Sequence, residues 1–154
     1  MIEFLDDLRA YLEKSFADDA DIKSAVSVVL QYTEAHAVRN EIQIMGLNDN
    51  TEADYESYES ENIAYVPVQI VPIASKQNIA GKQETSQRSA MIYAQKIQRL
   101  LEKVRASMWN ANIMRISRVG SDFAIPYETG SVFYVAPMRF DVYVRLPYAP
   151  VAQS

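Results

Sequence analysis

The feature that most constrains the fold is a long alternation of apolar and polar residues between residues 132 and 146. Every second side chain in this stretch is apolar: Val132, Tyr134, Ala136, Met138, Phe140, Val142, Val144 and Leu146. A period of two predicts a β-strand with one face on a core. Fifteen residues exceed the usual length of a strand. We therefore expect this strand either to bend near Pro137 or to extend beyond its own sheet to a neighbour.

Two segments in the first third of the chain also have a strand pattern. Residues 25–35 alternate and are rich in β-branched side chains, which strands favour. Residues 41–47 alternate as well, after a short turn around residues 37–40. We expect the two segments to pair as an antiparallel hairpin.

Two further strands are predicted in the middle of the chain. Residues 62–75 are apolar, but Pro67 and Pro72 cannot donate to a ladder, which predicts an edge strand or a strand that bends there. Residues 112–120 also predict a strand, with apolar side chains on both faces.

Two segments have the period of an amphipathic helix. The first covers residues 2–16, with Phe4, Leu5, Leu8, Leu12 and Phe16 on one face. The second covers residues 87–109, with Met91, Ala94, Ile97, Leu101, Val104 and Met108 on one face. Residues 76–86 are expected to be a linker in which Thr85 or Ser86 caps the second helix.

This order of elements predicts an α+β fold, in which the N-terminal and the long central helix pack on a mainly antiparallel sheet. We expect one domain over residues 1–147 and a C-terminal tail over residues 148–154. Residues 48–61 contain six acids and no base, so they are expected to form a long exposed acidic loop.

Charge is divided unevenly along the chain. Residues 1–75 contain 4 basic and 15 acidic side chains, a net charge of −11, whereas residues 76–154 contain 11 basic and 5 acidic side chains, a net charge of +6. One interpretation is an acidic loop and a basic helix on opposite faces of a monomer. The other is head-to-tail attraction between copies, which forms a ring when the rotation closes.

The sequence offers little material for catalysis or for a cofactor. It has no cysteine and a single histidine, His36, at an expected turn. It has none of the usual nucleophile, metalloprotease or phosphate-loop motifs, and the acidic stretch lacks the glycine and glutamate of a calcium loop. We therefore expect no enzymatic activity, no catalytic residue, no cofactor and no metal. No stretch approaches the ~20 apolar residues of a membrane span, so no membrane partner is expected.

In the order of its predicted helices and strands, the chain resembles the tail terminator, or tail completion, proteins of long-tailed bacteriophages. The resemblance covers residues 1–147, and it is carried by the N-terminal helix, the strand VPVQIVPIAS, the long helix, the strand IMRISRVG and the strand VFYVAPMRFDVYVRL. It implies a structural virion protein, made in the host bacterial cytoplasm, that forms a ring, commonly a hexamer, on the head-proximal end of the tail tube. Such a ring stops tube polymerisation, binds the head connector, and lets DNA pass without sequence-specific binding.

Other functions stay open at this stage. One is another head–tail joining component, a stopper or a tube-like subunit. Others are a small-ligand module, which needs a pocket with convergent polar groups, and an adaptor that binds a basic partner through its acidic loop.

Two sets of candidate interaction residues follow. The candidate partner or channel loop comprises Asp49, Glu52, Asp54, Tyr55, Glu56, Tyr58, Glu59 and Glu61. In a ring through which DNA slides, an acidic wall would repel the duplex rather than grip it. The candidate subunit-interface residues are Arg115, Arg118, Arg139, Asp141 and Arg145.

Overall fold

The computed structural model describes residues 2–30, 39–47, 55–58, 61–102, 109–120 and 123–151. Several predicted residues lie outside these ranges, namely Tyr32, His36, Asp49, Glu52, Asp54, Glu59, Val104 and Met108. In the described part of the chain there are two α-helices, α1 (Ile2–Ala17) and α2 (Ser86–Glu102). The strands are β1 (Ser27–Leu30), β2 (Glu41–Gly46), β3 (Tyr55–Tyr58), β4 (Glu61–Ala74), β5 (Gln77–Ile79), β6 (Lys82–Glu84), β7 (Ile113–Val119), β8 (Ile125–Pro126), β9 (Tyr134–Val135) and β10 (Met138–Leu146).

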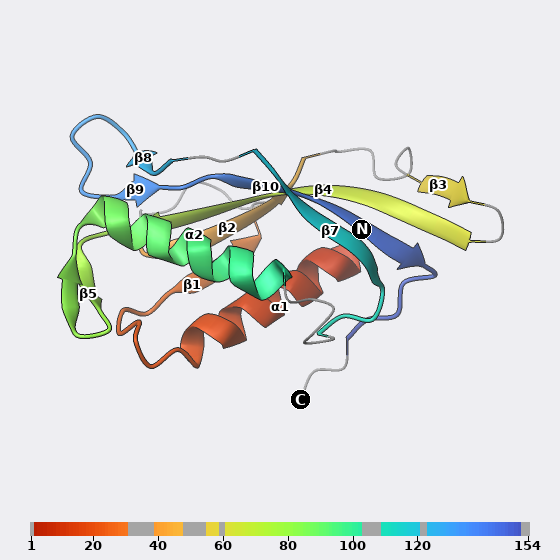
Figure 1. Cartoon of the computed structure of the whole chain (residues 1–154), viewed down its shortest axis with the longest axis horizontal. Helices are drawn as coiled ribbons and strands as arrows, with labels where there is room; N and C mark the ends of the chain where they lie inside the picture. The colour runs from red at the N-terminus through yellow and green to blue at the C-terminus, as the bar shows by residue number, and fades with distance from the viewer. Residues whose placement is uncertain are drawn as a thin grey trace.

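The fold is α+β, as the order of elements predicted. The strands of the main sheet follow the order β1-β2-β4-β10-β7, and β3 and β9 pair with the two ends of β4. Both helices lie on the same side of this sheet (Figure 1). They contact each other directly, since the Tyr11 hydroxyl of α1 donates to the Leu100 carbonyl of α2 and Phe16 packs edge-on against Tyr93.

The predicted hairpin between the first two strands is wrong in its direction. β1 and β2 are parallel, with Val28 opposite Ile42 and Leu30 opposite Ile44. Alternation shows which side chains share a face, but it contains no information about strand direction. The ten residues between the two strands can span about 33 Å, more than twice the length of the four-residue β1, so the chain can return to run alongside it.

β4 is a central strand and not the edge strand that its prolines suggested. It pairs with β2 on one side and with β10 on the other. The carbonyl of Pro67 accepts from the Leu47 amide just beyond the end of β2, and the carbonyl of Pro72 accepts from the Ala136 amide in the gap between β9 and β10. In an antiparallel strand the N–H and C=O of a residue point to the same side. An N–H at either proline would therefore point to a place where the neighbouring strand has ended, so its absence removes no hydrogen bond from the sheet.

The segment expected as a linker contains a hairpin. β5 and β6 pair through Gln77–Glu84 and Asn78–Gln83, and Ala80 and Gly81 form the turn with φ angles of 54° and 78°. Two consecutive positive φ angles are the mark of a type I′ turn. The cap prediction is confirmed, because the Thr85 hydroxyl accepts from the Arg88 amide at 3.2 Å.

The long C-terminal alternation is interrupted next to Pro137, where a bend was one of the two alternatives expected. β9 ends at Val135 and β10 begins at Met138. β9 pairs with the end of β4 and with the two-residue strand β8. The interruption leaves a two-residue strand, β9, and a nine-residue strand, β10.

The core lies between the helices and one face of the sheet. Its largest fully buried side chains are Tyr93, Phe4, Phe140, Leu8, Leu12, Ile42, Ile44, Ile70, Ile73, Ile97, Leu101 and Met138. Tyr93 was not among the predicted helix residues, because its hydroxyl suggests exposure. The Tyr93 hydroxyl donates to the side-chain oxygen of Gln77 at 2.8 Å. Burial raises the pKa of Tyr93 to about 12, although the bond to Gln77 lowers it.

Residues after β10 are held against α1. The Val151 amide donates to the buried carboxylate of Asp7 at 3.0 Å, and the Tyr148 hydroxyl donates to the same oxygen. Asn110 donates in turn to the Tyr148 hydroxyl at 2.7 Å. The tail expected over residues 148–154 thus begins in contact with the first helix of the domain, while residues 152–154 lie outside the described ranges.

Candidate subunit interface

The face of the main sheet that points away from the helices carries a regular array of side chains, which we call the outer face. Phe140, Val142 and Val144 of β10 are buried toward the helices, so the alternate residues of this strand point outward. Register then defines three rows across β4, β10 and β7. The rows are Gln69–Arg139–Val119, Pro67–Asp141–Ser117 and Tyr65–Tyr143–Arg115. Arg145 follows on β10 opposite Ile63.

A polar cluster joins these rows. The Tyr65 hydroxyl donates to Asp141 Oδ1 at 2.8 Å, and Arg139 donates to the Tyr65 oxygen at 3.1 Å and approaches Asp141 at 3.5 Å. The Tyr65 and Tyr143 rings stack with centroids 5.2 Å apart. Burial and the bond to Asp141 raise the pKa of Tyr65, so it stays a neutral donor at physiological pH. These contacts hold the Tyr65 and Tyr143 rings and the Arg139 guanidinium in place on the outer face.

The structure brings together four of the five candidate interface residues. Arg115, Arg139, Asp141 and Arg145 share the outer face by register. Arg118 lies on the opposite face, because it is paired with the buried Phe140 and donates to the side chain of Gln98 on α2. Alternation along residues 112–120 did not show which arginine faces inward, since both faces carry apolar side chains.

The acidic stretch differs in part from the expected loop. Residues 55–58 form β3, which pairs with β4 in antiparallel register from Tyr55–Ala64 to Tyr58–Glu61. Tyrosine favours strands, and this preference was the available signal for β3. We call residues 48–61 the acidic end; of these, the structure describes 55–58 and 61. Figure 1 places β3 near one extreme of the long axis of the molecule.

The opposite extreme of the long axis has an apolar surface that the sequence interpretation missed. β8 and β9 lie there (Figure 1), and four large apolar side chains of this region are exposed. They are Phe123, Ile125, Tyr127 and Val132, and we call this surface the apolar ribbon. The ribbon is anchored to the start of α2 because Ser86 donates to the Val132 carbonyl at 2.6 Å and Gln87 donates to the Ala124 carbonyl at 3.2 Å.

Several large exposed apolar side chains on one anchored ribbon make it a candidate contact surface. The available signal was the density of apolar residues in this segment, because the four side chains lie within ten positions of the sequence.

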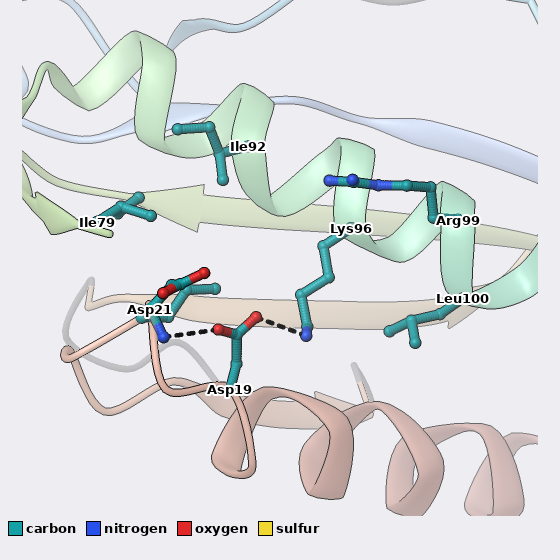
Figure 2. A pocket seen from close by; sticks show the side chains of 8 residues that line it. Asp19, Asp21, Ile79, Ile92, Lys96, Arg99 and Leu100 are labelled. Carbon is teal, nitrogen blue, oxygen red and sulfur yellow. Dashed lines mark hydrogen bonds and ion pairs between the residues drawn. The ribbon is translucent and has the colours of Figure 1, made fainter. Parts of the chain in front are cut away.

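A pocket of about 320 Å³ lies between α2, β5 and the turn after α1. Figure 2 shows Lys96 reaching from α2 to Asp19, whose other oxygen accepts from the Asp21 amide. The Lys96–Asp19 distance is 2.7 Å. Burial would raise the pKa of Asp19, but the Lys96 bond and the backbone donors hold it below its ordinary value. Lys96 and Asp19 pair with each other, and Asp21 and Arg99 also line the pocket.

No protein-family model matches the chain, and no curated protein sequence matches it. Among the described residues, no group of three or more histidine, aspartate and glutamate side chains is placed to hold a metal ion. No helix in the same ranges is both long and apolar enough to cross a membrane.

Proposed function

We propose that this protein is a structural subunit of a bacteriophage virion, a tail terminator that forms a ring at the head-proximal end of the tail tube. Copies join head to tail in a ring, a hexamer, through which DNA passes without sequence-specific binding. One side of the ring stops growth of the tube and the other binds the head connector.

The observation that carries the proposal is that the chain presents unlike surfaces in different places. β3 and the β8–β9 pair lie near opposite extremes of the long axis (Figure 1), and the arginine-bearing outer face lies between them. Such surfaces fit heterologous contacts, in which one patch meets a different patch on the next copy, and these close into rings or continue as filaments. The resemblance in element order selects the terminator from among the ring-forming proteins.

The test is to remove this protein from the phage that encodes it and to measure tail length by electron microscopy. We expect tubes of irregular and excessive length that carry no heads, and recovery of normal tails when the wild-type chain is supplied. Tails of normal length that fail to attach to heads would assign the chain to a stopper instead. Normal, infectious virions in its absence would contradict both functions.

A further inference from the structure

The chain leaves the sheet at the end of β10 and continues along the surface as a short segment, residues 147–151, which we call the strap. The last residue of β10 is Leu146, and no pairing between the described strands includes a strap residue. Three of the five strap residues are exposed, and the other two, Tyr148 and Val151, are half-buried. The strap can therefore leave the surface without breaking a pair of strands in the described sheet.

The strap is held by three side chains, which we call the seat: Asp7 of α1, and Asn110 and Asn112 of the segment before β7. One oxygen of the Asp7 carboxylate accepts from both the Tyr148 hydroxyl and the Val151 amide. The side chain of Asn112 bonds both main-chain groups of Ala149. It donates to the Ala149 carbonyl at 2.6 Å and accepts from the Ala149 amide at 3.2 Å, as a neighbouring strand would.

Contacts within the body of the domain hold the seat in position. The side-chain oxygen of Asn110 accepts from the backbone amide and from the side-chain amide of Asn112, each at 3.0 Å. The second side-chain hydrogen of Asn112 is thereby directed at the strap. Asn110 and Asp7 are 2% and 7% exposed, so both are fixed in the packed interior. A site whose donors and acceptors are already in place loses little conformational entropy when it binds.

These contacts define the segment that the seat recognises. It has a tyrosine, a free N–H and C=O at the next residue, and a free N–H three residues after the tyrosine. The Tyr148 ring also packs edge-on against Phe4, with centroids 6.3 Å apart. Pro150 has no N–H, and it lies between the two residues whose amides the seat binds. Proline restricts the strap before it docks, which lowers the entropy cost of docking.

The strap of a second copy meets these requirements as well as the strap of the same chain. Only Pro147 lies between the end of β10 and Tyr148, and every chain has one strap and one seat. Because the contacts are the same within one copy and between two copies, exchange of the strap is a low-cost route to association. The contact is heterologous, since the strap of one copy meets a different surface, the seat, on the next.

We infer that copies of this chain exchange their straps, so that the strap of one copy occupies the seat of its neighbour in the ring. This inference rests on the proposed function, because it names a contact that joins neighbours. In an isolated chain the strap lies in its own seat, which is the arrangement of the structure. In a ring the neighbour's strap is tethered close to the seat, at an effective concentration in the millimolar range, roughly.

The first test measures whether the seat binds a strap that belongs to another molecule. The protein is the chain truncated after Pro147, and the probe is a labelled synthetic peptide of residues 147–154, followed by fluorescence anisotropy. We expect saturable binding, and at least about tenfold weaker binding of the Tyr148→Phe peptide, which loses a bond to a carboxylate. The full chain with Tyr148→Phe is the second variant, since it removes a single hydroxyl. If the truncated chain is folded by thermal unfolding and the peptide does not bind, the inference is overturned.

The second test is complementation between two defective chains, measured by sedimentation velocity. The seat variant carries Asp7→Asn and Asn112→Ala, and the strap variant is truncated after Pro147. An equimolar mixture contains one usable strap and one usable seat per pair, so it should form heterodimers that do not grow further. Asp6→Asn with Asn78→Ala is the matched control for the seat variant, because it makes the same changes at exposed positions outside the seat.

We expect the wild type and the control to associate, and each defective chain alone to associate at least about tenfold more weakly. A mixture that stays monomeric would overturn the inference, as would defective chains that associate like the wild type. A wild type that stays monomeric at concentrations where the mixture dimerises would also overturn it, since each strap then remains on its own copy.

Tail length in the phage separates this inference from the proposed function. Tails of normal length on phage that carries only the truncated chain would contradict strap exchange and leave the terminator function standing. Normal tails in the complete absence of the protein would contradict the proposed function itself.

Discussion

Individual acids in this chain are stabilised by specific donors. The carboxylate of Glu84 accepts from Arg88 at 2.7 Å, and that of Glu41 accepts from Gln43 at 3.0 Å although it is almost fully buried. A carboxylate that is removed from water on folding needs hydrogen-bond donors or a positive charge beside it, because burying an unpaired charge costs several kcal/mol. The excess of acids in the first half of the chain therefore does not imply that all of them lie at the surface.

The substitution Asp19→Asn tests how much the Lys96–Asp19 ion pair stabilises the fold. The pKa of Asp19 lies below 3.8, so its ionised form stabilises the folded state above that pH. We expect the substitution to lower the free energy of unfolding by about 1 kcal/mol at neutral pH, since both partners are only partly buried. The difference should shrink as the pH falls below about 4, where the wild-type carboxylate becomes protonated. Asp18→Asn, at an exposed neighbour, is the control, and an equal loss there would contradict the role of Lys96.

At the scale of elements, the sequence predicted where helices and strands lie, but it did not predict which strands pair or in which direction. The helices, β7 and the break near Pro137 follow from spacing and from proline chemistry. The parallel direction of β1 and the central place of β4 do not, because they depend on which neighbours are present and where those neighbours end. β5 and β6 escaped notice because strands of three residues are too short to show a period. The same limit applies to the interface, where spacing grouped five residues and only register separated Arg118 from the others.

The β5–β6 turn gives a prediction at this scale. Ala80 has a positive φ of 54°, a conformation in which a Cβ is unfavourable and which asparagine tolerates better. Ala80→Asn should therefore raise the free energy of unfolding by about 0.5–1 kcal/mol. Ala80→Val should lower it, because a β-branched side chain is least compatible with this backbone. Denaturant unfolding of the two variants checks both signs, and a loss with asparagine would contradict the type I′ assignment.

At the scale of the whole molecule, the elongated sheet separates surfaces of different character. The outer face fits contacts between copies, and the apolar ribbon lies at one extreme of the long axis (Figure 1). A terminator must bind the end of the tube as well as its own neighbours. Under the proposed function, the apolar ribbon is the surface available for the tube.

Phe123→Asp tests this assignment. Phe123 is 75% exposed, so the substitution should change the free energy of unfolding by no more than about 0.5 kcal/mol. It should nevertheless prevent the chain from limiting tube length, because it places a charge in an apolar contact. Phe123→Leu, which keeps the surface apolar, should limit tube length normally. The measurement is the length distribution of tubes assembled with each variant, and normal lengths with Phe123→Asp would contradict the assignment.

The bonds from Tyr148 and Val151 to Asp7 have a consequence for the order in which the chain folds. They join residues that are 141 and 144 positions apart, so the segment they close is nearly the whole described chain. Contacts of such large sequence separation are slow to form, because much chain entropy is lost before they are made. We therefore expect the contact between Asp7 of α1 and residues 148–151 to form late in folding, after the sheet has assembled.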